Sequence, residues 1–322
     1  MGLLHSGSRA LAYWSGIAGR GERRENAARI LTFHGTPKEY SADLERQFRY
    51  LKRHFKIVSL PELVVRVQAR SASIGGLLAV TFDDGLRNNV SVAYPILQRL
   101  GIPATFFVCP GLIERGRWLW NHQARQRLQF ADAGLRRELG EQYDAPADVE
   151  GFIAWMKTLD LVSRHCVEKA LREATPGYSP SAAERHQFDV ARWDELWALD
   201  RSLVTIGSHG MTHAILPYLN AREVTFEVAE SRRLIEARLG RPVELFAYPN
   251  GEHSPLVVEC VRQHYAAAGA DSAAWVRPAS DPHVLPRITP RRGVLKLALS
   301  LHRRAAASHA WRPKPFAVGI SS

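Results

Sequence analysis

Short apolar runs alternate along the chain with segments whose apolar residues recur at helical spacing. The run Leu77 to Phe82 predicts a buried strand, because it is continuous and rich in β-strand formers. A helical segment follows and ends at Gly101, and the run Ala104 to Val108 predicts the next strand. Together with similar runs at 30–33 and 204–207, this unit predicts a parallel sheet or barrel wrapped by helices.

Residues 117 to about 190 interrupt this alternation with helical sequence. Between Val149 and Met156 the apolar residues recur at i, i+3, i+4 and i+7, and a second helical stretch runs from Arg164 to Ala174. Asp189 is expected to cap the helix that follows. We therefore predict one α/β domain at residues 29–290 that carries a helical insertion.

Composition and charge bear on the partners of this domain. The 322 residues are 46% hydrophobic, which is enough for a sizeable core, and the formal net charge is +11. The excess lies at the two ends, which predicts a basic arm at 1–28 and a basic tail at 291–322. An anionic membrane surface or a phosphate-bearing substrate fits this charge. Nucleic acid is disfavoured, since no zinc finger or other nucleic-acid motif is recognised.

The sequence also bears on cellular location. No apolar run approaches the roughly 20 residues needed to span a bilayer, and the first thirty residues contain several arginines and no continuous apolar core. Cys109, Cys166 and Cys260 are far apart and form no Cys-x-x-Cys pair. We expect a cytoplasmic protein without a signal peptide, either free or peripheral to the inner face of the membrane.

Polar residues follow the predicted strands at the points where the strands end. Asp83 and Asp84 follow one strand, and His209 ends another, with His213 four residues later. The carboxyl ends of parallel strands form the face on which active sites are built, so these groups should converge. A capping aspartate or a solvated pair of histidines explains either pair alone. Together they predict a metal site with two histidines and one aspartate as ligands.

Such a site predicts a particular chemistry. A divalent metal polarises an amide carbonyl and lowers the pKa of bound water to about 7. The aspartate that does not bind the metal is then free to take the proton from this water. We therefore expect one aspartate to be a ligand and the other a general base.

Two motifs carry a family resemblance. The sequence TFDDG at 81–85, followed by SHGMTH at 208–213, resembles the polysaccharide deacetylase family with the NodB homology domain, of the carbohydrate esterase type. The resemblance implies a distorted (β/α)7 barrel, similar to a TIM barrel. It implies Asp83 as the base and Asp84, His209 and His213 as metal ligands. It also implies a divalent metal, with zinc first and cobalt, nickel or manganese as alternatives.

A third segment, FAYPNG at 246–251, resembles another motif of this family but departs from it. Ala247 stands where the family often has an arginine that orients the base, and Arg287 is the candidate substitute. Asn250 replaces the aligned tyrosine, although its backbone N–H is still able to stabilise an oxyanion. Tyr248 is a further candidate for substrate contact.

The general acid is not marked by a motif. The late Leu-x-His motif of the family has no clean match here, since Ser300 stands in place of the leucine. His34, at the end of the first predicted strand, is the preferred candidate, and a histidine that merely ends a strand is the alternative interpretation. The other candidates are His302, His253 and His283.

The resemblance implies a hydrolase that removes N-acetyl groups from an amino sugar, in a polysaccharide or a lipid-linked glycan precursor. A deformylase or a cyclic-imide hydrolase that uses the same site is an alternative. An alternative hypothesis from a different functional class is a non-catalytic glycan-binding protein. Ala247, Asn250 and the unassigned acid favour this hypothesis.

Overall fold

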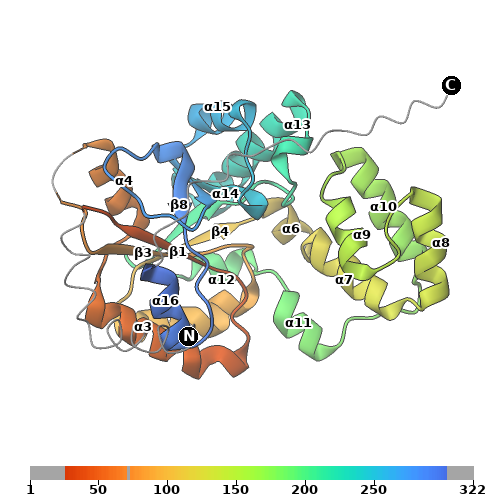
Figure 1. Cartoon of the computed structure of the whole chain (residues 1–322), viewed down its shortest axis with the longest axis horizontal. Helices are drawn as coiled ribbons and strands as arrows, with labels where there is room; N and C mark the ends of the chain where they lie inside the picture. The colour runs from red at the N-terminus through yellow and green to blue at the C-terminus, as the bar shows by residue number, and fades with distance from the viewer. Residues whose placement is uncertain (1–25, 71–72, 303–322) are drawn as a thin grey trace, which may run out of the picture.

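The computed structural model describes residues 26–70 and 73–302, and its centre is a parallel sheet that nearly closes into a barrel (Figure 1). The strand order is β1-β3-β4-β5-β6-β7-β8, every neighbouring pair is parallel, and β2 pairs with β3 outside this path. The strands are β1 (Arg29–Phe33), β2 (Lys56–Ile57), β3 (Leu77–Phe82), β4 (Ala104–Val108), β5 (Val204–Ser208), β6 (Leu245–Ala247), β7 (Ala267–Asp271) and β8 (Leu285–Arg287).

The barrel is joined between β8 and β1. The N–H of Thr32 donates to the carbonyl of Ile288 (3.0 Å), and the N–H of Ile288 donates to the carbonyl of Ile30 (2.8 Å). All residues of β1, β3 and β4 are buried, because helices cover the strands from outside and side chains fill the interior. The predicted seven-stranded (β/α) barrel is confirmed.

Helices surround this barrel. The predicted helix end at Gly101 is present, and Gly240 ends a second helix; both glycines adopt the left-handed conformation that ends a helix. The helices are α3 (Ser41–His54), α4 (Leu60–Gln68), α5 (Tyr94–Leu100), α6 (Pro110–Arg115), α12 (Trp193–Trp197), α13 (Ala221–Thr225), α14 (Ser231–Leu239), α15 (Pro255–His264) and α16 (Val294–His302). Short 3-10 or π turns are η1 (Lys38–Tyr40), η2 (Asn89–Ala93), η3 (Leu216–Tyr218), η4 (Phe226–Glu230), η5 (Pro249–Gly251) and η6 (Pro282–Val284).

The predicted insertion is helical, and Figure 1 shows α7 to α10 as a lobe beside the barrel. Its apolar core contains Phe152, Met156 and Leu171, and Ile215 from the loop after β5 joins this core. An aspartate or serine N-cap begins each of α8 to α11. The five helices are α7 (Trp120–Phe130), α8 (Ala133–Tyr143), α9 (Val149–Met156), α10 (Leu161–Ala174) and α11 (Ala182–Phe188).

One capping prediction was wrong. Asp189 does not cap α12, which begins at Trp193 after Arg192. Its carboxylate instead accepts a hydrogen bond from the indole Nε1 of Trp118 at 2.7 Å. A buried tryptophan N–H needs an acceptor, and this tertiary contact takes the carboxylate that a helix end would otherwise use.

The structure also moves the predicted boundary of the C-terminal tail. Leu297, Ala298 and Leu301 of α16 are buried, and α16 packs against α3. The folded domain therefore continues to residue 302, past the expected end at 290. The rest of the predicted basic arm and tail, residues 1–25 and 303–322, lies outside the described residues. Within the described ranges, no helix is both long and apolar enough to cross a membrane.

Candidate active site

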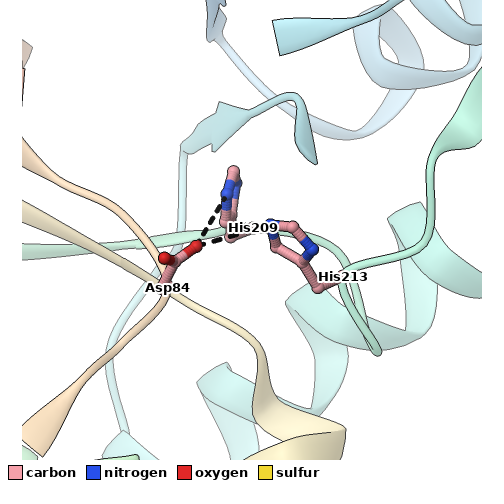
Figure 2. A group of neighbouring side chains, drawn as sticks. All are labelled: Asp84, His209 and His213. Atoms are coloured by element: carbon pink, nitrogen blue, oxygen red, sulfur yellow. Dashed lines mark ion pairs between the residues drawn. The ribbon is translucent and has the colours of Figure 1, made fainter. Parts of the chain in front are cut away.

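Asp84, His209 and His213 converge at the carboxyl ends of β3 and β5. The Asp84 Oδ1 atom lies 3.6 Å from His209 Nε2 and 3.4 Å from His213 Nε2. Figure 2 shows the carboxylate directed toward both imidazoles. All three residues are buried, and their ligand atoms lie within 4.8 Å of one another. Asp84 lies two residues after the end of β3, and His209 directly follows β5. Both strands end at the same face of the parallel barrel, with β4 between them, which brings the three residues together.

These distances fit a tetrahedral metal ion. Bonds of about 2.0–2.1 Å to such an ion place two ligand atoms roughly 3.3 Å apart, close to the two separations from Asp84. The carbonyl of Ala247 accepts a hydrogen bond from His209 Nδ1 (2.8 Å), which leaves Nε2 with its lone pair toward the site. The other ring nitrogen of His213, Nδ1, is buried without a partner among the described residues. The donor set therefore fits a divalent ion.

The protonation states agree with this fit. Burial lowers the pKa of His209 to about 4, so the imidazole is neutral at pH 7 and able to bind a metal. Burial alone would raise the pKa of Asp84, but its hydrogen bond to His213 and the neighbouring histidines hold that pKa below the ordinary value. An anionic aspartate and a neutral histidine are the forms that bind a divalent cation.

The backbone at this site is in an uncommon conformation. Asp84 has a φ of 74° and His213 a φ of 58°, and Asn250 after β6 also has a φ of 58°. Side chains other than glycine rarely adopt this region, and such residues gather at functional sites. The described part of the chain has five non-glycine residues with a positive φ, and these three lie at the barrel's carboxyl face.

Asp83, beside the three converging residues, is paired with Arg287. The guanidinium donates from Nη1 to Asp83 Oδ1 and from Nη2 to Oδ2, each at 2.8 Å. Both residues are 1% exposed. Burial is the largest single influence and raises the pKa of Asp83, but the charge and hydrogen bonds of Arg287 together with the neighbouring histidines outweigh it, so the pKa lies below its ordinary value. Asp83 is therefore held ionised in a fixed orientation, 3.8 Å from His209 Nε2.

Neighbouring residues that sequence reasoning missed hold Arg287 in place. Its Nη2 also donates to Asp271 Oδ1 (3.1 Å), which is paired with Arg287 in the β7–β8 register. Gly269 in β7 leaves room for the side chain, because a Cβ there would lie 2.5 Å from Arg287 Cδ. Only knowledge of which strand lies beside β8 would have identified these two residues.

The loop between the two histidines has its own support, which sequence reasoning also missed. Glu227 in η4 is fully buried, and it accepts from the N–H (2.9 Å) and the hydroxyl (2.6 Å) of Thr212. Two residues of the insertion reach the same loop. Trp120 Nε1 donates to the carbonyl of His213 (2.9 Å), and Arg164 Nη2 donates to Thr212 Oγ1 (3.3 Å). The loop that carries His209 and His213 is thus fixed from both the barrel and the insertion.

Comparison with known protein families identifies this arrangement. The family model described as polysaccharide deacetylase matches residues 72–269, about three fifths of the chain, and this match includes both motifs. The chain belongs to the polysaccharide deacetylase family. It matches no curated protein sequence at a significant level. As a member of this family it is a hydrolase that acts on amide bonds, and an acetylated glycan is the class of substrate.

Solved structures of deacetylases share the fold of this polysaccharide deacetylase. The Streptococcus pyogenes deacetylase PplD, solved in complex with acetate, has a TM-score of 0.58 and 16% identity, over 86% of this chain and 99% of that one. IcaB from Ammonifex degensii has a TM-score of 0.57 and 17% identity, over 86% of this chain and 97% of that one. These identities support a common barrel, and the site must be argued from the residues of this chain.

The remaining predicted residues of the deacetylase divide into two groups. His34 is exposed at the carboxyl end of β1, and Asn250 is exposed after β6, where its Oδ1 accepts from Lys157 Nζ of the insertion (2.9 Å). Tyr248 is fully buried, and its hydroxyl donates to the carbonyl of His283 (2.8 Å). Because the side chain of Tyr248 has no exposed surface, it is not available to contact a substrate.

The alternative general acids have other positions. His283 is buried, and its two ring nitrogens contact Tyr265 and Arg262. His253 packs its ring 5.2 Å from that of Tyr248. The side chain of His302 lies outside the described residues. His34 therefore remains the candidate at the end of a strand next to Asp83.

Proposed function

We propose that this deacetylase removes N-acetyl groups from an amino sugar of a polysaccharide or a lipid-linked glycan precursor, with zinc as the first candidate for its metal. The observation that carries the proposal is the approach of Asp84, His209 and His213 to metal-ligand spacing beside the buried pair of Asp83 and Arg287. A ligand set and a separate ionised carboxylate are what metal-assisted amide hydrolysis requires.

A divalent ion held by Asp84, His209 and His213 would act as a Lewis acid on the amide carbonyl and lower the pKa of the attacking water. Asp83 takes the proton of this water, because its carboxylate is ionised and lies 3.8 Å from His209 Nε2. Arg287 orients Asp83 through two hydrogen bonds, the role that Ala247 does not fill.

Two exposed groups complete the proposed chemistry. The backbone N–H of Asn250 stabilises the negative charge that develops on the carbonyl oxygen, which needs no particular side chain. His34 donates a proton to the departing amine, from the end of β1. The position of His34 supports this role. The residue before it, Phe33, accepts a hydrogen bond at its carbonyl from the N–H of Asp83 (2.9 Å), so His34 lies beside the proposed base.

The test is acetate release from N-acetylglucosamine oligomers and from a lipid-linked N-acetylated sugar. We expect Asp83→Asn to lower kcat by about 100- to 10,000-fold, because it removes the general base. Asp194→Asn is a matched control, since that carboxylate lies on the outer face of the barrel in α12 and is 69% exposed. Chelation should abolish activity, and added zinc should restore it.

The possible outcomes separate the alternatives. Activity that survives chelation would contradict the metal mechanism. Release of formate, or opening of a cyclic imide in the same substrate panel, would favour the related hydrolases. Tight glycan binding without product from a zinc-loaded sample would favour the non-catalytic glycan-binding protein, which Ala247, Asn250 and the unassigned acid motivate. Of these three, the Arg287–Asp83 pair answers the first, because it supplies from β8 the contact that Ala247 lacks.

A further inference from the structure

A pocket that shares only His34 with the proposed chemistry opens beside the ends of β1 and β8. Its volume is about 200 Å³. The side chains that give it its chemical character are Phe33, His34, Thr36, Tyr40, Arg291 and Arg292. His34 connects it to the active site, because it follows Phe33, whose carbonyl accepts from the N–H of Asp83. The pocket is thus next to the place where the acetamido group would react.

Two arginines give this pocket a positive charge. Arg291 and Arg292 are exposed, and neither pairs with a carboxylate within residues 26–70 and 73–302. The guanidinium of Arg292 lies over the ring of Tyr40, 3.1 Å from its centroid. A guanidinium stacked on an aromatic ring keeps its N–H edges free for an anion.

The one acidic side chain in the pocket wall already has partners. The oxygens of Asp43 accept from Arg46 Nη2 (3.2 Å), Gln47 Nε2 (3.1 Å) and the N–H of Gly293 (2.9 Å). Gln47 Nε2 also donates to the carbonyl of Arg291 (3.3 Å). These bonds attach the backbone of residues 291–293 to α3, so the two arginines extend from a fixed segment.

We propose that this pocket binds an oxyanion group of the glycan, a phosphate or a carboxylate, adjacent to the sugar that loses its acetyl group. The proposal rests on the proposed function, which places the reacting sugar beside His34. Guanidinium groups bind such oxyanions through paired hydrogen bonds, whereas a neutral sugar would leave both charges without a partner. The net charge of +11 adds long-range attraction for the same ligand.

Binding to the metal-free full-length protein tests the pocket without turnover. The probes for calorimetry are N-acetylglucosamine 1-phosphate, a disaccharide of N-acetylglucosamine and glucuronic acid, and neutral N-acetylglucosamine. We expect at least one charged probe to bind about tenfold more tightly than the neutral sugar, and this preference to weaken as salt is added. The phosphate and carboxylate probes distinguish the two sources of the anion.

Matched double variants assign the preference to the pocket. Arg291→Ala with Arg292→Ala should reduce the preference for the charged probe by about 5- to 10-fold, as expected for two partly exposed charge contacts. Arg49→Ala with Arg53→Ala removes the same charge from the exposed face of α3, outside the pocket, and should keep the preference.

Three results would overturn the proposal: no binding of either charged probe, equal affinity for charged and neutral probes, or a preference that survives in the pocket variant. The measurement is independent of catalysis. If the metal-loaded protein releases no acetate but the charge preference depends on the pocket arginines, the proposed function fails and the oxyanion site stands. The reverse pattern rejects the oxyanion site alone.

Discussion

Arg287→Met would test whether the buried pair with Asp83 orients this proposed general base. Methionine keeps much of the side-chain volume in the barrel but removes the charge. Both residues are 1% exposed, and the two hydrogen bonds of 2.8 Å are then lost together. Removing one partner leaves an uncompensated buried carboxylate, which costs about 3–5 kcal/mol of unfolding free energy.

The effect should depend on pH in a defined direction. Arg287 depresses the pKa of folded Asp83, so the stability from the pair is present above the unfolded pKa and is lost as pH falls through the folded pKa. In the variant, burial acts without Arg287 and the pKa of Asp83 rises. The carboxyl group of the variant is then protonated on mild acidification. The difference in unfolding free energy between the wild-type protein and the variant, called the stability gap below, therefore narrows by about 1.4 kcal/mol per pH unit in that range.

Urea unfolding of metal-free protein at pH 7.5 and pH 5 would measure this gap. We also expect kcat at pH 7.5 to fall by about 100-fold or more, because the base loses its orientation. Arg238→Met is the control, since its pair with Glu114 is exposed and should contribute less than about 1 kcal/mol at both pH values. A difference of the same size at both pH values, or one below about 1 kcal/mol at pH 7.5, would refute the reasoning.

Two further substitutions test the missed supporting residues. Gly269→Ala places a Cβ 2.5 Å from Arg287 Cδ, so the guanidinium must move away from its partner. We expect a loss of about 1–3 kcal/mol in stability and of about 100-fold in kcat. Glu227→Gln replaces one of the two oxygens that accept from Thr212. We expect zinc affinity, measured by competition with a chelating dye, to fall by about 10- to 100-fold.

Controls in comparable positions make these two results interpretable. Gly177→Ala introduces only an ordinary contact, 3.6 Å from Phe130, and should leave kcat unchanged. Glu230→Gln alters a 40% exposed carboxylate in the same η4 turn and should leave zinc affinity unchanged. An unaltered kcat in Gly269→Ala would contradict the close approach to Arg287. Equal zinc affinity in the two glutamine variants would contradict the support of the loop by Glu227.

The parts of the fold that depend on local apolar runs were predictable from sequence. The runs at 77–82 and 104–108 became β3 and β4, since strands covered on both faces need continuous apolar residues. β7 was not predicted, because Ala267–Asp271 consists of small residues and an aspartate. Such a strand is specified by its neighbours, among them the large side chain of Arg287, and local propensity does not reveal it.

The same distinction applies to the site. Asp84 and His209 were predictable because each follows a buried strand, and the barrel brings such positions together. Glu227 lies in a segment that reads as an ordinary amphipathic helix. There the chain forms a π turn, η4, and Glu227 within it is fully buried, which no sequence periodicity indicates. α16 was missed for a related reason, since its basic surroundings concealed its apolar face.

The supporting contacts explain how the uncommon backbone of the ligand loop persists. A residue such as His213 in the left-handed region costs on the order of 1 kcal/mol or more, so surrounding contacts must favour it. Here Glu227 fixes the preceding Thr212 from the barrel, and Trp120 fixes the carbonyl of His213 from the insertion. Because the insertion contributes one of these contacts, it takes part in positioning His213, a proposed metal ligand. Its docking and the geometry of the site are therefore parts of one structure, and a change that loosens the insertion should reach the metal through Trp120.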